Sequence, residues 1–210
     1  MPNLIDNVIV QFDAALKTLV PGSVHAHRSN PAAEQETAEL NDSERKQVAG
    51  LMRINHTGEV CAQALYQGQA LTARLPEVRD SMNHAAAEEI DHLSWCEDRL
   101  NELDSHPSLL NPVWYGMSFG LGALAGLAGD RWSLGFVAET EKQVCAHLQE
   151  HLGRLPEQDL RSEAILTQML EDEGRHAVNA EAAGAANLPA PIKGAMTLMA
   201  GVMKQTTYRI

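Results

Sequence analysis

Six acidic and histidine side chains recur in this 210-residue chain with a spacing that could bind metal ions. Each half of the chain carries one isolated glutamate, followed 30 or 32 residues later by a Glu-x-x-His motif. The six residues are Glu59, Glu89, His92, Glu141, Glu173 and His176. Residues three positions apart lie on the same face of a helix, so the carboxylate and the imidazole of each motif could bind one ion. Corresponding residues of the two halves are 82 to 84 positions apart, which indicates a repeated arrangement.

The chemistry of this set favours a pair of iron ions. Buried carboxylates are costly unless they are protonated, paired or bound to a cation, and no Lys or Arg shares their predicted faces. Four carboxylates with two imidazoles suit iron or manganese better than tetrahedral zinc or an oxygen-only calcium site. One lone Glu and one Glu-x-x-His, repeated twice, is the ligand pattern of ferritin-like di-iron bundles. We therefore predict two iron ions per chain, with O2 as co-substrate.

Four long helices are predicted to position the six residues. Apolar residues recur at intervals of three and four, so each helix carries one of the glutamates on the stripe that should be buried. Asn41 offers an N-cap for the first helix, and Pro76 suits the first turn of the second. The predicted ranges are about 41–74, 76–103, 130–152 and 157–183. Shorter apolar helices are expected within residues 1–20, 113–128 and 192–203. The predicted fold is all-α: a ferritin-like four-helix bundle with a crossover helix and additional apolar helices.

Composition agrees with this fold and excludes several classes of protein. Only 4% of the residues are aromatic, whereas sheets rely on aromatic and β-branched side chains. A formal net charge of −12 disfavours nucleic acid as a partner. The three cysteines form no CxxC pair, which is typical of a reduced, cytoplasmic-type protein. Acidic residues inside the first apolar pattern disfavour a secretory signal peptide.

Two segments are expected. Residues 41–210 form the ferritin-like di-iron catalytic domain, and residues 1–40 form an N-terminal amphipathic helix and a loop or mobile linker. The apolar side chains of that first helix are Ile5, Val8, Ile9, Phe12, Leu16 and Val20.

The uncharged segment 113–128 contains four glycines and is shorter than the roughly 20 residues of a membrane span. Its glycines allow two interpretations, close packing of helices or a hydrophobic groove that contacts a membrane.

Residues beside the six candidate ligands receive separate interpretations. Glu88, Asp91 and Glu139 lie off the buried stripes and are predicted to face solvent or to cap helices. Asp172 could hydrogen-bond a ligand imidazole from outside the metal site. His147 lies six residues after Glu141 and off its stripe, which indicates a surface or groove position.

The motifs resemble those of a known family. Residues 51–59 (LMRINHTGE) and 66–69 (YQGQ) resemble the first ligand helix of the demethoxyubiquinol hydroxylases of ubiquinone biosynthesis. Residues 88–92 (EEIDH), 139–141 (ETE) and 171–176 (EDEGRH) fall where that family has its remaining ligands. The resemblance covers about residues 41–210. It implies that the six residues bind iron, with Glu89 and Glu173 as bridges, and that His147 lies close to the site as a catalytic residue that is not itself a ligand.

The same resemblance implies an activity and partners. The expected reaction is the O2-dependent 3-hydroxylation of 3-demethoxyubiquinol, a polyprenyl-methoxy-methyl-benzoquinol. The expected partners are this quinol, a membrane surface and a lipid-handling accessory protein, which the family suggests in some organisms. No dinucleotide motif is present, so electrons are expected from the quinol or from a separate reductant. Trp114, Tyr115, Phe119 and the Met-rich last helix could admit the quinol at a lipid–water boundary. The expected location is therefore the cytoplasmic side of the cell membrane, as a peripheral protein.

Two other functions share the ligand pattern. One is iron oxidation and storage in a bacterioferritin-like cage, although a cage would not need an uncharged crossover or an apolar last helix. The other is a rubrerythrin-like peroxidase, although the chain lacks the four cysteines of a rubredoxin motif. A bundle that binds no metal and serves only as an interaction module is the third alternative.

Overall fold

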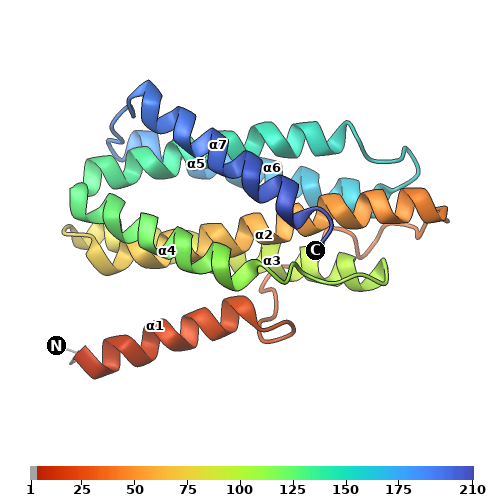
Figure 1. The fold of residues 1–210 in the computed structure, drawn as a ribbon, viewed down its shortest axis with the longest axis horizontal. Coiled ribbons are helices and arrows are strands. Elements are labelled where there is room, and N and C mark those ends of the chain that lie inside the picture. The colour runs from red at the N-terminus through yellow and green to blue at the C-terminus, as the bar shows by residue number, and fades with distance from the viewer. Residues whose placement is uncertain (1–3) are drawn as a thin grey trace.

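The computed structural model describes residues 4–210, and within that range the chain contains seven helices and no strand (Figure 1). The prediction of an all-α, ferritin-like fold is confirmed. The helices are α1 (Leu4–Leu19), α2 (Asp42–Thr72), α3 (Pro76–Glu102), α4 (Asn111–Ala128), α5 (Asp130–Leu152), α6 (Leu160–Ala182) and α7 (Ala190–Thr207).

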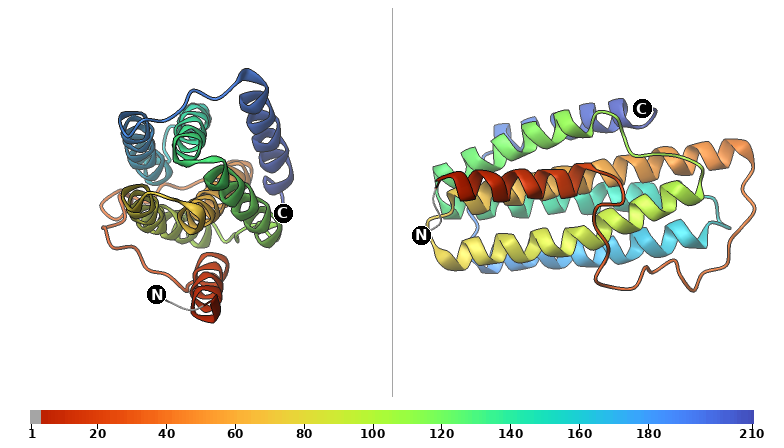
Figure 2. Two further views of the ribbon diagram at one scale, coloured as in Figure 1. Left: turned by 90° about the vertical axis from the view of Figure 1, so that its left-hand side faces the viewer. Right: turned by 90° about the horizontal axis from the view of Figure 1, so that it is seen from below.

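The four long helices α2, α3, α5 and α6 form the bundle. Viewed along their axes, α2 lies beside α3 and α5 lies beside α6, while α4 and α7 cover one side (Figure 2, left). Helix α4 is the predicted crossover, which packs along α2 while it leads the chain from α3 to α5. By spanning from α3 to α5 along α2, helix α4 allows the pair α2 and α3 to face the pair α5 and α6.

The bundle core consists of two apolar clusters at opposite ends of the long helices. One contains Met52, Trp95, Leu148 and Met169. The other contains Tyr66, Met82, Leu134 and Ala180. Along each helix the candidate ligands lie between these two clusters, so the polar site is enclosed by apolar layers at both ends.

Local signals in the sequence set the helix boundaries. The Asn41 side chain accepts hydrogen bonds from the backbone N–H of Ser43 at 2.9 Å and of Glu44 at 3.0 Å, and the Glu44 carboxylate accepts the Asn41 N–H in return. This reciprocal arrangement is a capping box. Pro76 occupies the first turn of α3, where its missing N–H has no consequence. Both predictions are confirmed.

The glycines of α4 serve close packing at two positions. A Cβ at Gly122 would overlap the Leu65 carbonyl oxygen of α2, and one at Gly126 would overlap the Thr72 hydroxyl. Gly116 and Gly120, in contrast, have no neighbour within 4 Å of the position a Cβ would take. The packing interpretation therefore holds for Gly122 and Gly126.

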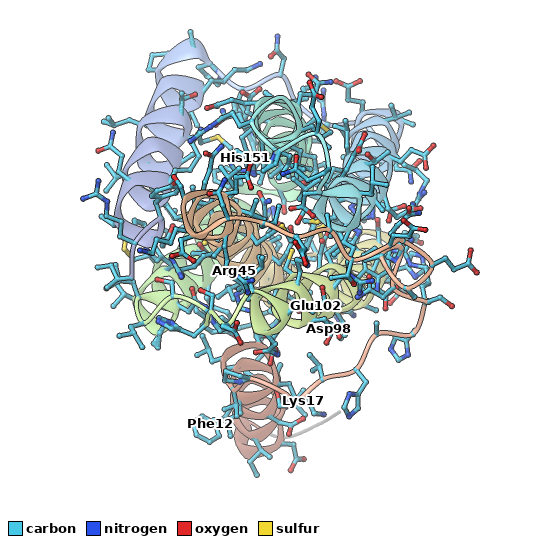
Figure 3. All side chains as sticks on the ribbon, turned by 90° about the vertical axis from the view of Figure 1, so that its right-hand side faces the viewer. Phe12, Lys17, Arg45, Asp98, Glu102 and His151 are labelled. Carbon is cyan, nitrogen blue, oxygen red and sulfur yellow. The ribbon has the colours of Figure 1, made fainter. Side chains whose placement is uncertain are left out.

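Helix α1 lies at the edge of the molecule, where Figure 3 shows Phe12 projecting away from the bundle. Ile9, Phe12 and Leu16 are exposed, and the side chains of Ile5 and Val8, which the sequence places on the same apolar face, lie outside the described residues. None of the helices described in residues 4–210 combines the length and the hydropathy that a bilayer-crossing span requires.

Residues 23–40, here called the strap, connect α1 to α2 without forming a helix, as expected for a loop. The strap runs along the outside of α3 and α6 (Figure 2, right). Ala32 is buried in the core, Asn30 donates a hydrogen bond to Asp98 of α3, and Arg161 of α6 donates one to the Gln35 carbonyl. These contacts attach the strap to the bundle.

Candidate metal centre

Four of the six predicted residues form one tight cluster. Each of Glu59, Glu89, His92 and Glu173 offers one oxygen or ring nitrogen, and these atoms all lie within 4.8 Å of one another. All four side chains are buried. The cluster could hold a metal ion.

Glu89 and Glu173 lie between the two histidines. The Nδ1 of His92 is 3.0 Å from one oxygen of Glu89 and 3.1 Å from one oxygen of Glu173. The Nδ1 of His176 is 3.2 Å from the other oxygen of each carboxylate. Each of these two glutamates therefore presents one oxygen to each imidazole, an arrangement in which a carboxylate can bridge two ions.

The two remaining glutamates lie farther from the imidazoles. The Oε2 of Glu59 is 3.7 Å from the Nδ1 of His92 and has no hydrogen-bond partner. Glu141 accepts a short hydrogen bond from the Tyr66 hydroxyl through Oε1, while its buried Oε2 has no partner. Glu141 and His176 are not part of the four-residue cluster. Together with Oε1 of Glu89, three buried carboxylate oxygens of the set have no hydrogen-bond partner, which fits a site that is completed by cations.

The electrostatics of the set couple its carboxylates to its imidazoles. Burial raises the pKa of Glu59 and Glu141, and the charges of Glu89 and Glu173 raise both further. Burial alone would lower the pKa of His176, but its contacts with Glu173 and Glu89 raise it to about 12. For the same reason, contacts with Asp172 and Glu173 raise the pKa of His92 in spite of its burial. The carboxylates and imidazoles of this set therefore shift one another's pKa values strongly.

The outer nitrogen of each imidazole binds a carboxylate from the other Glu-x-x-His helix. The Nε2 of His92 donates to Asp172 at 2.9 Å, and the Nε2 of His176 donates to Glu88 at 2.7 Å. The predicted hydrogen bond between Asp172 and an imidazole is confirmed. These contacts turn Nδ1 of both rings toward Glu89 and Glu173, the usual way of orienting a metal-binding histidine.

The prediction that Glu88, Asp91 and Glu139 face solvent or cap helices is wrong. Glu88 binds His176, and Asp91 is buried and forms an ion pair with Arg28 of the strap. Glu139 is half-buried and forms an ion pair with Lys193 of α7 at 3.0 Å. The stripe of a single helix could not reveal these contacts, because every partner lies on another element.

His147 lies in a groove, one of the two positions expected for it, and outside the carboxylate cluster. Its ring centroid is 5.2 Å from that of His151, whose Nδ1 lies 2.9 Å from the Asn55 side-chain oxygen. Burial lowers the pKa of His147 to about 3 and that of His151 to about 4. Both imidazoles are therefore neutral at pH 7.

His147 lines an apolar cavity of about 260 Å³ between α2, α4, α5 and α7. Gly58 and Thr140, which precede Glu59 and Glu141, also line it. A small adjoining void shares four of the lining residues and extends to Tyr66 and Glu141. The adjoining void therefore reaches Glu141, and the cavity itself reaches the residues that directly precede Glu59 and Glu141.

Comparisons with known proteins agree with this arrangement. A family model described as Ubiquinone biosynthesis protein COQ7 matches residues 46–207. The chain is 62% identical over 206 residues to the 3-demethoxyubiquinol 3-hydroxylase of Ectopseudomonas mendocina (strain ymp), covering 98% of this chain and 96% of that protein. Proteins of the same name from Pseudomonas putida (strain GB-1) and Stutzerimonas stutzeri (strain A1501) are 59% and 61% identical. They cover 98% of this chain, and 96% and 95% of the relatives.

Proposed function

The chain belongs to the family described as Ubiquinone biosynthesis protein COQ7, and on that premise we propose that it is a 3-demethoxyubiquinol 3-hydroxylase. The proposed enzyme is a di-iron monooxygenase that adds one hydroxyl group to the ring of its quinol. The observation that carries this proposal is the apolar cavity lined by Gly58 and Thr140, which directly precede the candidate ligands Glu59 and Glu141. A storage cage would have no need of such a cavity.

The proposed iron ligands are the six residues of the repeated pattern: Glu59, Glu89, His92, Glu141, Glu173 and His176. Glu89 and Glu173 are the proposed bridges, because each presents one oxygen to each imidazole. A bound pair of ferrous ions would supply electrons for the reduction of O2, one atom of which enters the ring while the other leaves as water. Two electrons from the quinol or from a separate reductant would return the ions to the ferrous state after each turnover, and two protons would complete the water.

The cavity is proposed to hold the quinol ring. Its lining is almost entirely apolar, and Ser118, Thr140, Gln143 and His147 supply its few polar side chains. A volume of about 260 Å³ lies below the roughly 300–1,000 Å³ of sites for drug-sized ligands, which suits a substituted ring better than a whole polyprenyl quinol. The polyprenyl tail would therefore leave between α4 and α7. Neutral His147 is proposed to lie next to the ring.

Such a substrate resides in lipid, so we also propose peripheral attachment to the cytoplasmic face of the cell membrane. Leu124 and Leu127 of α4 and Leu198 and Val202 of α7 are exposed, on the two helices that flank the cavity. A net charge of −12 offers no attraction to anionic headgroups, so apolar contacts must carry the attachment. A lipid-handling accessory protein could assist transfer. Residues 41–210 are the proposed catalytic domain, and residues 1–40 the appended segment.

A product assay tests the activity. The full chain is loaded with ferrous iron and supplied with 3-demethoxyubiquinol, O2 and a reductant, and mass spectrometry should detect a quinol one oxygen atom heavier. The Ala200→Trp variant fills the cavity from α7, so we expect it to lose this product while it still binds two iron ions. Ala182→Trp, on the exposed side of α6, is the matched control. No product, together with iron uptake far above two ions per chain, would instead support iron storage.

Flotation with neutral phosphatidylcholine vesicles tests membrane attachment. We expect the unchanged chain to float with the vesicles, and the Leu124→Asp and Leu198→Asp variants to remain in the soluble fraction. Leu160→Asp, at an exposed site on α6, is the control. Equal flotation of all four proteins would contradict attachment through α4 and α7.

A further inference from the structure

The two Glu-x-x-His motifs differ in charge at the residue before the histidine. The second motif has Arg175 there, and its guanidinium lies 2.9 Å from Asp172 and 3.3 Å from Glu88. This arginine is thus close to both carboxylates that bind the imidazoles. The first motif has Asp91 at the equivalent position. The first motif therefore has a buried negative charge at the position where the second motif has a positive charge.

Arg28 of the strap supplies the missing cation. Its Nε lies 2.6 Å from Asp91 Oδ2, and its Nη1 lies 2.8 Å from Asp172 Oδ2. The backbone N–H groups of His27 and Arg28 donate to the other oxygen of Asp91 at 2.6 and 3.4 Å. The guanidinium also lies over the Trp95 ring, 4.9 Å from its centroid. The strap thus places one cation against two buried carboxylates.

This cation lies directly behind His92. Asp172 Oδ2 accepts from both Arg28 and the Nε2 of His92, while its Oδ1 accepts from Arg175 and from Gln168 at 3.2 Å. The Nη2 of Arg28 approaches the Nε2 of His92 to 3.4 Å, a contact that is not a hydrogen bond when Nε2 carries its proton. Because Nε2 is held by Asp172, Nδ1 is the nitrogen that faces Glu89 and Glu173.

We propose that Arg28 is a positioning residue for the metal centre. It fixes Asp172 and compensates Asp91, so that His92 keeps Nδ1 directed at the carboxylate cluster. This inference rests on the proposed role of His92 as a metal ligand. Arg28 precedes residue 46, where the match to the family model begins, so the strap contributes a part of the site that lies outside that match.

The competing explanation is that Arg28 only holds the strap to the bundle. Asn30 separates the two explanations, because it lies two residues away and attaches the same strap to Asp98 without contacting any candidate ligand. An Asn30→Ala variant loosens the strap but keeps the cation, whereas Arg28→Gln removes the cation. Arg28→Lys keeps the charge but loses the forked geometry that reaches two carboxylates.

The test is a titration of the full-length, metal-free variants with Mn(II) alone, followed by calorimetry and by the electron paramagnetic resonance signal of the bound ions. The unchanged chain should bind two Mn(II) ions with the signal of an interacting pair. Arg28→Gln should bind one of the two ions about 10- to 100-fold more weakly, the usual effect of losing a group that orients a metal-binding histidine. At limiting Mn(II), this variant should show the signal of an isolated ion. Arg28→Lys should recover part of the affinity, and Asn30→Ala should match the unchanged chain.

A second variant removes the risk that Arg28→Gln simply unfolds. In Arg28→Gln/Asp91→Asn the uncompensated charge of Asp91 is gone, yet Oδ2 of Asp172, the oxygen that holds His92, still lacks the Arg28 cation. Binding should therefore stay weak although circular dichroism shows a folded chain. Full recovery in this double variant would overturn the proposal, as would equal weakening by Asn30→Ala or unchanged binding by Arg28→Gln. If the unchanged chain binds no Mn(II), the proposed function itself fails.

Discussion

The candidate metal centre is built from two half-sites with the same pattern and different surroundings. The first half-site comprises Glu59, Glu89 and His92; the second comprises Glu141, Glu173 and His176. His92 is fully buried, and its partner Asp172 is also fully buried. His176 is slightly exposed, and its partner Glu88 has a side chain that is 26% exposed. The first half-site also takes its outer cation from the strap, whereas the second has Arg175 on its own helix.

This difference shows that repeated ligand spacing does not require repeated support. A ligand pattern depends on a few positions of one helix face, but the groups that orient it can come from any neighbouring element. The strap covers Asp91 and Asp172, the outer carboxylates of the first half-site, so water has little access to them. The second half-site can exchange its outer partner for water at lower cost. Metal binding at the two half-sites should therefore respond differently when the corresponding outer carboxylate is replaced.

The largest effect is expected where the two half-sites meet. Glu89 contacts both imidazoles, so Glu89→Ala should abolish binding of the metal pair and lower the hydroxylation rate by roughly 1000-fold or more, since metal catalysis contributes several kcal/mol. Glu59→Ala, which changes only the His92 end, should leave one ion bound. Metal analysis and the product assay measure both effects. Retention of two ions by Glu89→Ala would contradict the bridging arrangement.

The dependence of metal binding on pH should be the next largest effect. The pKa values of His92 and His176 are raised, so both imidazoles carry an additional proton at pH 7 that a metal ion must displace. Raising the pH therefore favours binding, and the Kd for Mn(II) should tighten by about 100-fold per pH unit if both protons are released. Titrations between about pH 6 and about pH 8, together with proton release in weakly buffered solution, measure this slope. A Kd that is independent of pH would show that the imidazoles are already deprotonated.

Exchange of the outer carboxylates should reveal the asymmetry directly. Asp172→Ala removes a fully buried partner of His92 and should weaken Mn(II) binding by about 10- to 100-fold. Glu88→Ala should have a smaller effect, because water can reach the Nε2 of His176 and replace the lost acceptor. Calorimetric titration of the two variants side by side provides the comparison. Equal losses would mean that burial of the outer partner has no influence on the site.

The sequence was sufficient to predict the long helices, because their apolar residues follow helical periodicity. Residues such as Glu59 and Glu141 lie on apolar stripes, so their inward direction could be predicted, and Asn41 and Pro76 predicted where helices begin. The structure brings these residues to the middle of the bundle, while their roles as ligands stay predictions. Helical periodicity says which way a side chain points from its own axis and nothing about the neighbouring element. The predicted solvent-facing or capping position of Asp91 is therefore wrong. Its partner Arg28 lies in the strap, a loop without helical periodicity, so the sequence pattern could not indicate the contact.

The smallest effect on the metal site is expected from α4, which packs along α2, the helix that carries Glu59. A Cβ at Gly122 would overlap the Leu65 carbonyl, so Gly122→Val must push α4 away from α2 and should lower the free energy of unfolding by about 1–3 kcal/mol. Gly116→Ala is the matched control, because no atom lies within 4 Å of the added Cβ and alanine favours the helix. Thermal or urea unfolding of both variants measures the difference. Because α4 contributes no candidate ligand, the Gly122 variant should still bind two Mn(II) ions while it is folded. A loss of one ion would show that the packing of α4 on α2 also positions the metal site.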